Sequence, residues 1–317
     1  MTTDRFDLPE PIFVSVGGDL VATYELSPDV DVPSADVVFC HGTPWSAQVW
    51  AQAARHLSVG HRVYLWDMPG YGRSARGSQV RTDLATQMSR FAKLLDHWKL
   101  ERPFVVAHDI GGAVALGAHL IHGRDYGSLF LWDVVTLDPW GSPFFRLVSE
   151  HRDVFAALPA SLHAALVSEY IAGAAHQRLD RDIVATLTEP WISDEGQPDF
   201  YRQIAELRPE DTRPIVEALP RVRCDTSIGW GRQDPWIPVE QAHRLRQLLP
   251  GESSVITVPD VGHLSPLEAP SRVQQALDVW LRTSEQLLSL CLVDTGLRGA
   301  ETNGNVPYRR QRGPVGS

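Results

Sequence analysis

Cysteine is scarce in this sequence of 317 residues, which carries only three. They are Cys40, Cys224 and Cys291, and no two of them have the spacing of a CxxC motif. An odd number of widely separated cysteines is typical neither of a disulfide framework nor of a zinc site. We therefore expect no metal site and no network of structural disulfides.

Long apolar runs and an excess of basic charge are also missing. No apolar stretch reaches the roughly 20 residues of a membrane-spanning helix, and the first seven residues lack the apolar core of a signal peptide. The formal net charge is −10, which gives no electrostatic reason to bind nucleic acid or an anionic membrane. We expect a cytoplasmic protein without nucleic-acid or membrane partners, whose oligomeric state the sequence leaves open. A basic cluster at Arg309, Arg310 and Arg312 is interpreted as a solvated end.

Short apolar runs alternate with helical patterns along most of the chain. This alternation is typical of an α/β fold, in which a mostly parallel sheet has helices on both faces. A Gly17-Gly18 pair between the first two runs predicts a hairpin. The expected strands cover residues 13–16, 21–25, 37–40, 62–66, 104–107, 129–135, 226–230 and 254–258.

The pattern changes in the middle of the chain. From residue 137 to residue 219 no strand-like run appears, and helical periodicity dominates. A segment of this length is too long for a simple loop, so it predicts a helical cap inserted between two parts of one sheet. The predicted division is a first core part at 1–136, the cap at 137–219, a second core part at 220–293 and a disordered tail at 294–317.

One segment has the layout of a nucleophile elbow. Residues 105–112 read Val-Val-Ala-His-Asp-Ile-Gly-Gly, so Asp109 stands between a β run and a helix with small residues on either side. In an elbow the middle side chain projects from a sharp turn above the strand ends, and the small neighbours allow close backbone approach. Ala107 replaces the glycine that is usual there. The alternative is that Asp109 caps the following helix.

Two further residues follow Asp109 in the order acid, then histidine. Asp234 lies in Trp-Gly-Arg-Gln-Asp-Pro-Trp after one late strand, and His263 follows the next strand. Ligand sites of open α/β sheets form at such strand ends. Alone, Asp234 would begin a turn before Pro235, and His263 would be a surface loop residue. Together with Asp109 they predict a catalytic triad in the order nucleophile, acid, histidine.

The loop His-Gly-Thr-Pro at 41–44 follows an early strand. In this layout one backbone N–H of an oxyanion hole comes from such a loop, and the other comes from the residue after the nucleophile. We therefore expect the amides of Thr43 and Ile110 to be the donors. The alternative for the loop is an ordinary turn.

Together, the motifs HGTP, DMPGYGRS, AHDIGG, WGRQDPW and GH resemble the epoxide hydrolase and dehalogenase branch of the α/β-hydrolase superfamily, over most of residues 12–284. The resemblance implies the α/β-hydrolase fold with a helical cap and a hydrolase without a cofactor.

An aspartate is ionised at neutral pH and needs no base to attack. Its attack on an ester carbonyl would give an anhydride, whereas attack on an sp³ carbon gives a stable alkyl ester. The expected substrates are a small, mostly apolar organic compound and water.

The leaving group separates the two halves of this branch. Epoxide opening needs a proton donor opposite Asp109, and in epoxide hydrolases cap tyrosines supply it, which implies Tyr170 and Tyr201. The alternative for each tyrosine is packing of the cap. Haloalkane dehalogenases instead carry an Asn inside HGxP and a Trp directly after the nucleophile, where this chain has Thr43 and Ile110.

Dehalogenases that act on haloacetate carry arginines around the elbow, where this chain has Ile110 and Ala113. The indoles of Trp45, Trp140 and Trp191 remain as halide donors, and Trp45 and Trp140 are expected to contact the substrate. The balance predicts an epoxide hydrolase. The alternatives are a haloalkane or haloacid dehalogenase, a cofactor-free lyase, or a ligand receptor on the same fold.

Overall fold

A computed structural model describes residues 5–28 and 35–300 of the chain, and their side chains as far as Leu287. Within these ranges eight strands form one sheet in the order β1-β2-β4-β3-β5-β6-β7-β8. The hairpin β1–β2 and the pair β2–β4 are antiparallel, and all other neighbouring strands are parallel. This confirms the predicted mostly parallel α/β sheet. The strands are Ile12–Val16 (β1), Asp19–Leu26 (β2), Asp36–Cys40 (β3), Arg62–Trp66 (β4), Phe104–His108 (β5), Ser128–Trp132 (β6), Asp225–Gly231 (β7) and Ser254–Val258 (β8).

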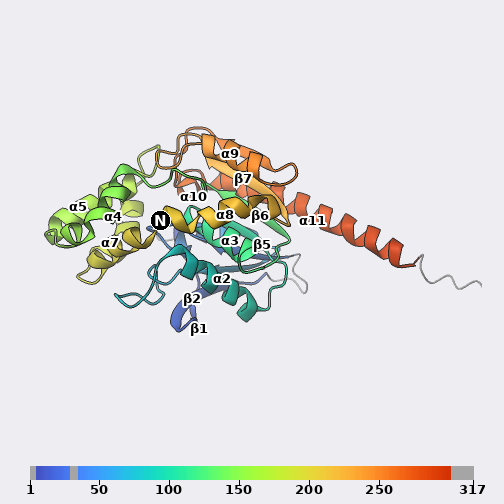
Figure 1. Ribbon diagram of the computed structural model, residues 1–317, viewed down its shortest axis with the longest axis horizontal. Helices are drawn as coiled ribbons and strands as arrows, with labels where there is room; N and C mark the ends of the chain where they lie inside the picture. The colour runs from blue at the N-terminus through green and yellow to red at the C-terminus, as the bar shows by residue number, and fades with distance from the viewer. Residues whose placement is uncertain (1–4, 29–34, 301–317) are drawn as a thin grey trace, which may run out of the picture.

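Helices cover the sheet, and its central strands are mostly apolar and buried along their whole length. Every residue of β5 and of β6 is buried, as expected for parallel strands with helices on both faces. On the sheet, α2 packs against α3 (Figure 1). The helix α1 packs against the long last helix, α11. These helices, with α9 and the short α10, are Ala51–Leu57 (α1), Leu84–Trp98 (α2), Ile110–Leu120 (α3), Glu240–Leu248 (α9), Ser265–Glu268 (α10) and Pro270–Ala300 (α11).

A group of helices lies between β6 and β7. Residues 133–224, all of which are described, contain no strand. In this group α4 packs on α7 and α5 on α6, whereas α8 contacts α3 of the core (Figure 1). Because α8 lies within the predicted cap but contacts the core, the cap boundaries at 137 and 219 remain a prediction. The elements are Pro143–Ala156 (α4), Ala160–Ala172 (α5), Arg181–Thr188 (α6), Gly196–Glu206 (α7) and Arg213–Ala218 (α8), with 3-10 turns at Ala47–Trp50, Glu189–Trp191, Pro209–Asp211 and Leu219–Arg221.

Two elements differ from the expectation in ways that have a physical reason. The strand expected at 129–135 ends at Trp132, because Asp133 has a φ of +46° and an extended strand cannot continue through that conformation. The last helix runs to Ala300, so residues 294–300, which were predicted to belong to a disordered tail, are helical. Each added residue gains one hydrogen bond on an existing helix. Residues 301–317, with the basic cluster, lie outside the described residues.

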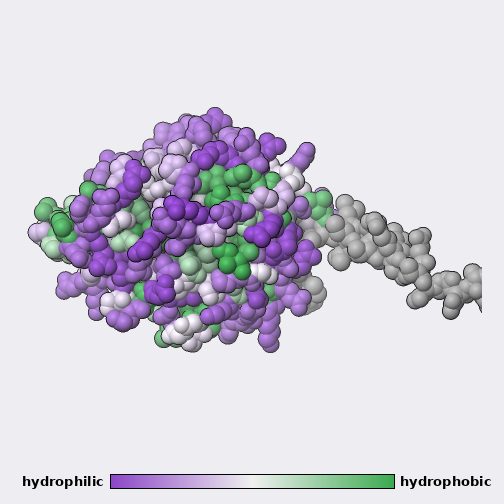
Figure 2. Space-filling view, viewed as in Figure 1, coloured by the Kyte–Doolittle hydropathy of each residue, from purple (hydrophilic) through white to green (hydrophobic). Residues whose placement is uncertain are grey.

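The surface is mostly hydrophilic on the face drawn in Figure 2, with smaller apolar areas between. The exposed apolar side chains include Leu147, Val154 and Leu162 on α4 and α5. Scattered exposed apolar residues are normal on soluble domains and carry no functional argument. None of the described helices is long and apolar enough to cross a membrane.

Candidate active site

Asp109 stands at a sharp turn between β5 and α3. Its φ of +53° and ψ of −127° are unusual for a residue with a side chain, and such backbone strain gathers at functional sites. A Cβ on Gly111 would lie 2.4 Å from the carbonyl oxygen of His41, and one on Gly112 would lie 2.3 Å from a methyl group of Val134. The small residues after Asp109 are therefore required by close packing. The Asp109 side chain makes no capping hydrogen bond to α3, unlike the helix-cap alternative.

The loop after β3 holds one oxygen of the Asp109 carboxylate. The backbone N–H of Thr43 donates a hydrogen bond of 2.8 Å to Oδ1, and the Thr43–Pro44 peptide bond is cis. A Cβ on Gly42 would lie 2.4 Å from the Cβ of Asp109, so this loop can approach only with glycine there. Across the described residues, the Ile110 amide makes no hydrogen bond to the carboxylate. Ile110 does border the same cavity.

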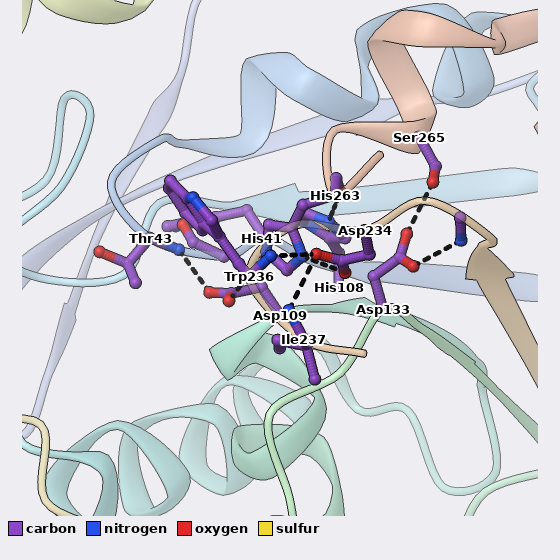
Figure 3. A network of polar contacts seen from close by, with 12 residues as sticks. His41, Thr43, His108, Asp109, Asp133, Asp234, Trp236, Ile237, His263 and Ser265 are labelled. Carbon is purple, nitrogen blue, oxygen red and sulfur yellow. Dashed lines mark hydrogen bonds and ion pairs between the residues drawn. The ribbon is translucent and has the colours of Figure 1, made fainter. Parts of the chain in front are cut away.

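His263 joins the other oxygen of Asp109 to a second carboxylate (Figure 3). Its Nε2 lies 3.1 Å from Oδ2 of Asp109, and its Nδ1 lies 2.7 Å from Oδ2 of Asp234. The second oxygen of Asp234 accepts hydrogen bonds from the backbone N–H groups of Trp236 and Ile237, at 2.7 and 2.9 Å. The structure thus brings together Asp109, His263 and Asp234 from three strand ends. Asp234 is held in place from both of its oxygens.

The pKa values of this buried series are shifted in opposite directions. Burial alone would raise the pKa of Asp109, but the hydrogen bond and charge of His263, then His108 and the Thr43 amide, leave it below its ordinary value. Burial alone would lower the pKa of His263, but the charge of Asp234 and the hydrogen bonds to both carboxylates raise it well above its ordinary value. The resting site therefore holds an imidazolium between two carboxylates.

A third carboxyl group, Asp133, stands behind this series and was not found from the sequence. It follows β6 directly, and it is fully buried. Its Oδ1 accepts a hydrogen bond of 2.7 Å from the Gly231 amide, and its Oδ2 lies 2.7 Å from the hydroxyl oxygen of Ser265 (Figure 3). Burial, then the charge of Asp234, raises the pKa of Asp133 well above its ordinary value. The signal for it was an aspartate at the end of a buried strand, the position class that already singled out Asp234.

A small cavity of about 30 Å³ opens beside Asp109. Tyr170 of α5 borders it and stacks on Trp236 with ring centroids 4.6 Å apart. In the part of the chain that is described, the Tyr170 hydroxyl has no hydrogen-bond partner. Burial and the charge of Asp109 raise the Tyr170 pKa, so the phenol keeps its proton at neutral pH. The lining consists of Thr43, Asp109, Ile110, Val135, Trp140, Gly141, Ser142, Phe145, Tyr170, Trp236 and Ile237.

Tyr201, the other tyrosine predicted at the site, lies elsewhere among the helices between β6 and β7. It is fully buried in α7, it does not border the cavity, and its hydroxyl lies 2.8 Å from Nδ1 of His163. Nε2 of His163 lies 2.9 Å from the Trp191 carbonyl oxygen, which can only accept, so Nε2 carries the proton and Nδ1 accepts from Tyr201. The Tyr201 proton is therefore already bound within the cap.

The tryptophans divide in a similar way. Trp140 borders the cavity, but its indole N–H donates to Oγ1 of Thr212 at 3.1 Å. The Trp191 indole donates to the Pro44 carbonyl at 2.7 Å. Trp45 is buried and stacks on Trp236 at 5.6 Å, and its indole N–H has no partner among the described side chains and backbone. Trp45 is not part of the cavity lining.

Among the described residues, no group of three or more His, Cys, Asp or Glu side chains is placed to hold a metal ion. The site offers a carboxylate with both oxygens engaged, an imidazole behind it and a phenol across a small apolar cavity. This set can attack an electrophilic carbon, deliver a proton and activate water.

Comparison with known proteins agrees with this fold. The chain belongs to the alpha/beta hydrolase family, whose model matches residues 37–276. An alpha/beta hydrolase fold protein from Burkholderia ambifaria is 38% identical, with a TM-score of 0.80 over 86% of this chain and 98% of that one. The haloalkane dehalogenase DbeA from Bradyrhizobium elkani is 18% identical, with a TM-score of 0.72 over 87% and 98% of the two chains, and supports the fold alone.

Two curated relatives are similar over much of their length. The dihydrolipoyllysine-residue acetyltransferase component of the acetoin cleaving system of Pseudomonas putida is 25% identical over 298 residues, covering 88% of this chain and 71% of that protein. A 2-hydroxy-6-oxo-2,4-heptadienoate hydrolase of Pseudomonas putida is 27% identical over 224 residues, covering 67% and 77%. These similarities extend to hydrolases with different substrates, so the substrate has to be argued from the site.

Proposed function

We propose that this hydrolase converts a small, mostly apolar epoxide to a diol through a covalent ester on Asp109. One observation carries the proposal. The carboxylate at the elbow has one oxygen on the Thr43 amide and the other on His263. The Tyr170 hydroxyl, which has no hydrogen-bond partner among the described residues, borders the same cavity. The three groups correspond to the nucleophile, the base and the acid that epoxide hydrolysis requires.

In the first step, Oδ2 of Asp109 attacks a ring carbon of the epoxide. The carbon–oxygen bond of the strained ring breaks, and the leaving oxygen takes the proton of Tyr170. The products are a hydroxyalkyl ester of Asp109 and a tyrosinate. The raised pKa of Tyr170 keeps the donor protonated before the step. General acid help of this kind contributes about 10²- to 10⁴-fold in rate.

In the second step, His263 removes a proton from water, and the hydroxide adds to Cγ of Asp109. Negative charge then develops on Oδ1, where the Thr43 N–H stabilises it. When this intermediate collapses, the bond between Cγ and the ester oxygen breaks, the leaving oxygen takes a proton from the His263 imidazolium, and the diol is released from the restored Asp109 carboxyl group. Ester formation removes the charge and the hydrogen bond of Asp109, which both raise the pKa of His263. Before water attacks, the imidazolium therefore releases its extra proton, and this proton restores Tyr170. Neutral His263 then acts as the base.

Two alternatives have weaker support. The 2-hydroxy-6-oxo-2,4-heptadienoate hydrolase among the relatives suggests a carbonyl substrate, but a carboxylate that attacks an ester carbonyl carbon forms an anhydride, which is a poor intermediate. A halide would need N–H donors in the cavity, and of the two described tryptophans that border it, Trp140 already donates its indole N–H to Thr212. A lyase or a ligand receptor would require neither the covalent ester nor a base held between two carboxylates.

The deciding experiment is intact-protein mass spectrometry of His263→Gln after exposure to aryl epoxides, haloalkanes and a 2-hydroxy-6-oxodienoate. Loss of the base should leave alkylation intact and stop ester hydrolysis, so an adduct with the mass of the whole epoxide should accumulate. Peptide mapping should locate it on Asp109. The matched control is the double variant Asp109→Asn/His263→Gln, which should stay unmodified.

The other outcomes are equally informative. An adduct that lacks the halogen would change the assignment to a dehalogenase. Rapid turnover of an epoxide by His263→Gln would contradict the role of His263. A folded variant that forms no adduct with any compound would overturn the covalent mechanism and favour the lyase or the receptor.

A further inference from the structure

We propose that Asp133 is a positioning residue that carries a proton at neutral pH and, as a neutral acid, links the loop of Asp234 to the loop of His263. Asp133 touches neither the cavity nor the Asp109 carboxylate. It acts through the two loops that hold the acid and the base. The kinetic part of this inference rests on the proposed function, whereas the protonation of Asp133 does not.

The first observation is that Asp133 bridges the two loops. Its Oδ1 accepts from the amide of Gly231, three residues before Asp234. Its Oδ2 meets the hydroxyl of Ser265, two residues after His263. Asp133 is fully buried, and its backbone φ of +46° is uncommon for a residue other than glycine. The strain and the double contact indicate a built connection.

The second observation is a count of protons around Ser265. Its Oγ lies 2.7 Å from Oδ2 of Asp133 and 3.0 Å from the carbonyl oxygen of Gly262. A serine hydroxyl has one proton, and a carbonyl oxygen can only accept. An ionised Asp133 would leave two buried acceptors competing for that proton. A protonated Asp133 donates to Ser265, and Ser265 donates to Gly262, so every group has a partner.

The electrostatic surroundings agree with this count. The titratable groups that act on Asp133 are Asp234, after β7, and His263, after β8. Burial and the negative charge of Asp234 both oppose ionisation of Asp133, and His263 favours it only in part. Two neighbouring buried carboxyl groups do not both ionise readily. A neutral Asp133 therefore leaves Asp234 as the carboxylate that orients His263, and avoids a second negative charge behind the base.

The direct test is infrared spectroscopy of the folded protein at neutral pH, comparing wild type with Asp133→Asn. The difference spectrum should contain the carbonyl band of one protonated carboxylic acid in the wild type, shifted in D₂O. Other buried acids cancel because they are present in both proteins. Loss of a carboxylate band in place of this one would overturn the proposal.

The second test uses single-turnover kinetics of ester formation and ester hydrolysis. Asp133→Ala should slow hydrolysis by about 100-fold through misplacement of His263, and change ester formation far less. Asp133→Asn should rescue most of this loss, because its amide N–H₂ can donate to Ser265 as the acid does. If Asp133→Ala does not fold, Ser265→Ala replaces it, since it removes the same link from the other side.

The pH profile distinguishes positioning from a charge effect. Asp133→Asn should leave the pH profile of ester hydrolysis unchanged, because no charge is lost. If the limb of the profile that reports the pKa of His263 shifted to lower pH in Asp133→Asn, Asp133 would have been ionised, and the inference would be contradicted. The control is Asp234→Asn, which removes a charge beside His263 and should shift that limb. If no substrate forms an ester, the proposed function fails, and the infrared band still decides whether Asp133 is protonated.

Discussion

At the scale of single residues, the proposed chemistry depends on which tyrosine hydroxyl is free to donate its proton to the substrate. Tyr170 and Tyr201 both lie in cap helices, but the Tyr201 hydroxyl donates to His163, whereas the Tyr170 hydroxyl has no partner among the described residues. A proton already held in a buried hydrogen bond costs free energy to remove. Among the described residues, Tyr170 is the only tyrosine that borders the cavity, which supports it as the proposed acid.

This difference predicts opposite results for two matched substitutions. Tyr170→Phe should reduce the rate of epoxide opening by about 10²-fold or more, through loss of the acid, without lowering stability much. Tyr201→Phe leaves Nδ1 of His163 buried and unpaired, so it should lower the free energy of unfolding by about 1–3 kcal/mol and affect the chemical step little. Pre-steady-state rates and urea unfolding separate the two. Equal losses of rate would contradict the assignment.

These same residues show what the sequence could and could not predict. Asp109, Asp234 and His263 could be found because each lies directly after a strand or in the loop that follows one, and parallel strands bring their ends to one edge of the sheet. The roles of Tyr170 and Tyr201 could not be separated, since helical spacing does not say how a helix is rotated against the core. Asp133 was hidden because the apolar run around it suggested a longer strand.

At the scale of secondary-structure elements, two of the helices between β6 and β7, α4 and α7, contribute to the site. Phe145 of α4 borders the cavity, and Gln203 of α7 accepts hydrogen bonds from the side chains of Thr43 and Tyr71, at 2.7 and 2.8 Å. The loop that holds Asp109 is therefore tied to the cap. The cavity has about 30 Å³ of space, little more than one water molecule needs, so the side chains that border it, Phe145 among them, limit the size of the substrate.

Removing the Phe145 ring should change which epoxide is preferred. Phe145→Ala should raise kcat/KM for a bulky aryl epoxide relative to a small alkyl epoxide by about 10-fold or more, the range for a changed hydrophobic pocket. The matched control is Phe155→Ala on the same helix, because Phe155 packs on Phe144 and Tyr201 and does not border the cavity. Competition assays with both epoxides measure the ratio. An unchanged ratio would place the size limit elsewhere.

At the scale of the whole molecule, the sheet brings together residues that are distant in the chain. Asp109 and His263 are 154 positions apart, yet their side chains meet because β5, β6, β7 and β8 are consecutive neighbours with parallel strands. The site thus forms only when the two core parts have assembled around the intervening helices. Its buried titratable groups should therefore couple global stability to pH.

His108 determines how stability should change with pH on the acid side of neutrality. Burial, then the charge of His263, lowers its pKa from 6.5 to about 3. Between these values the unfolded chain binds a proton that the folded protein does not, so stability falls as pH falls. The raised pKa of His263 acts in the opposite range, because its contribution is complete below about 6.5 and is lost as pH rises through the folded pKa.

Urea unfolding of wild type and His108→Gln at pH 7.5 and pH 5 measures the His108 contribution. Gln retains a donor for the His263 carbonyl, which His108 Nε2 contacts at 2.8 Å, but it cannot titrate. On acidification, the free energy of unfolding of the wild type should fall by up to about 2 kcal/mol more than that of His108→Gln. This is the linkage contribution of one histidine at pH 5, about 1.5 pH units below its unfolded pKa. His243→Gln, exposed on α9, should behave like the wild type. Equal acid losses in wild type and His108→Gln would mean that the folded protein protonates His108 despite its burial.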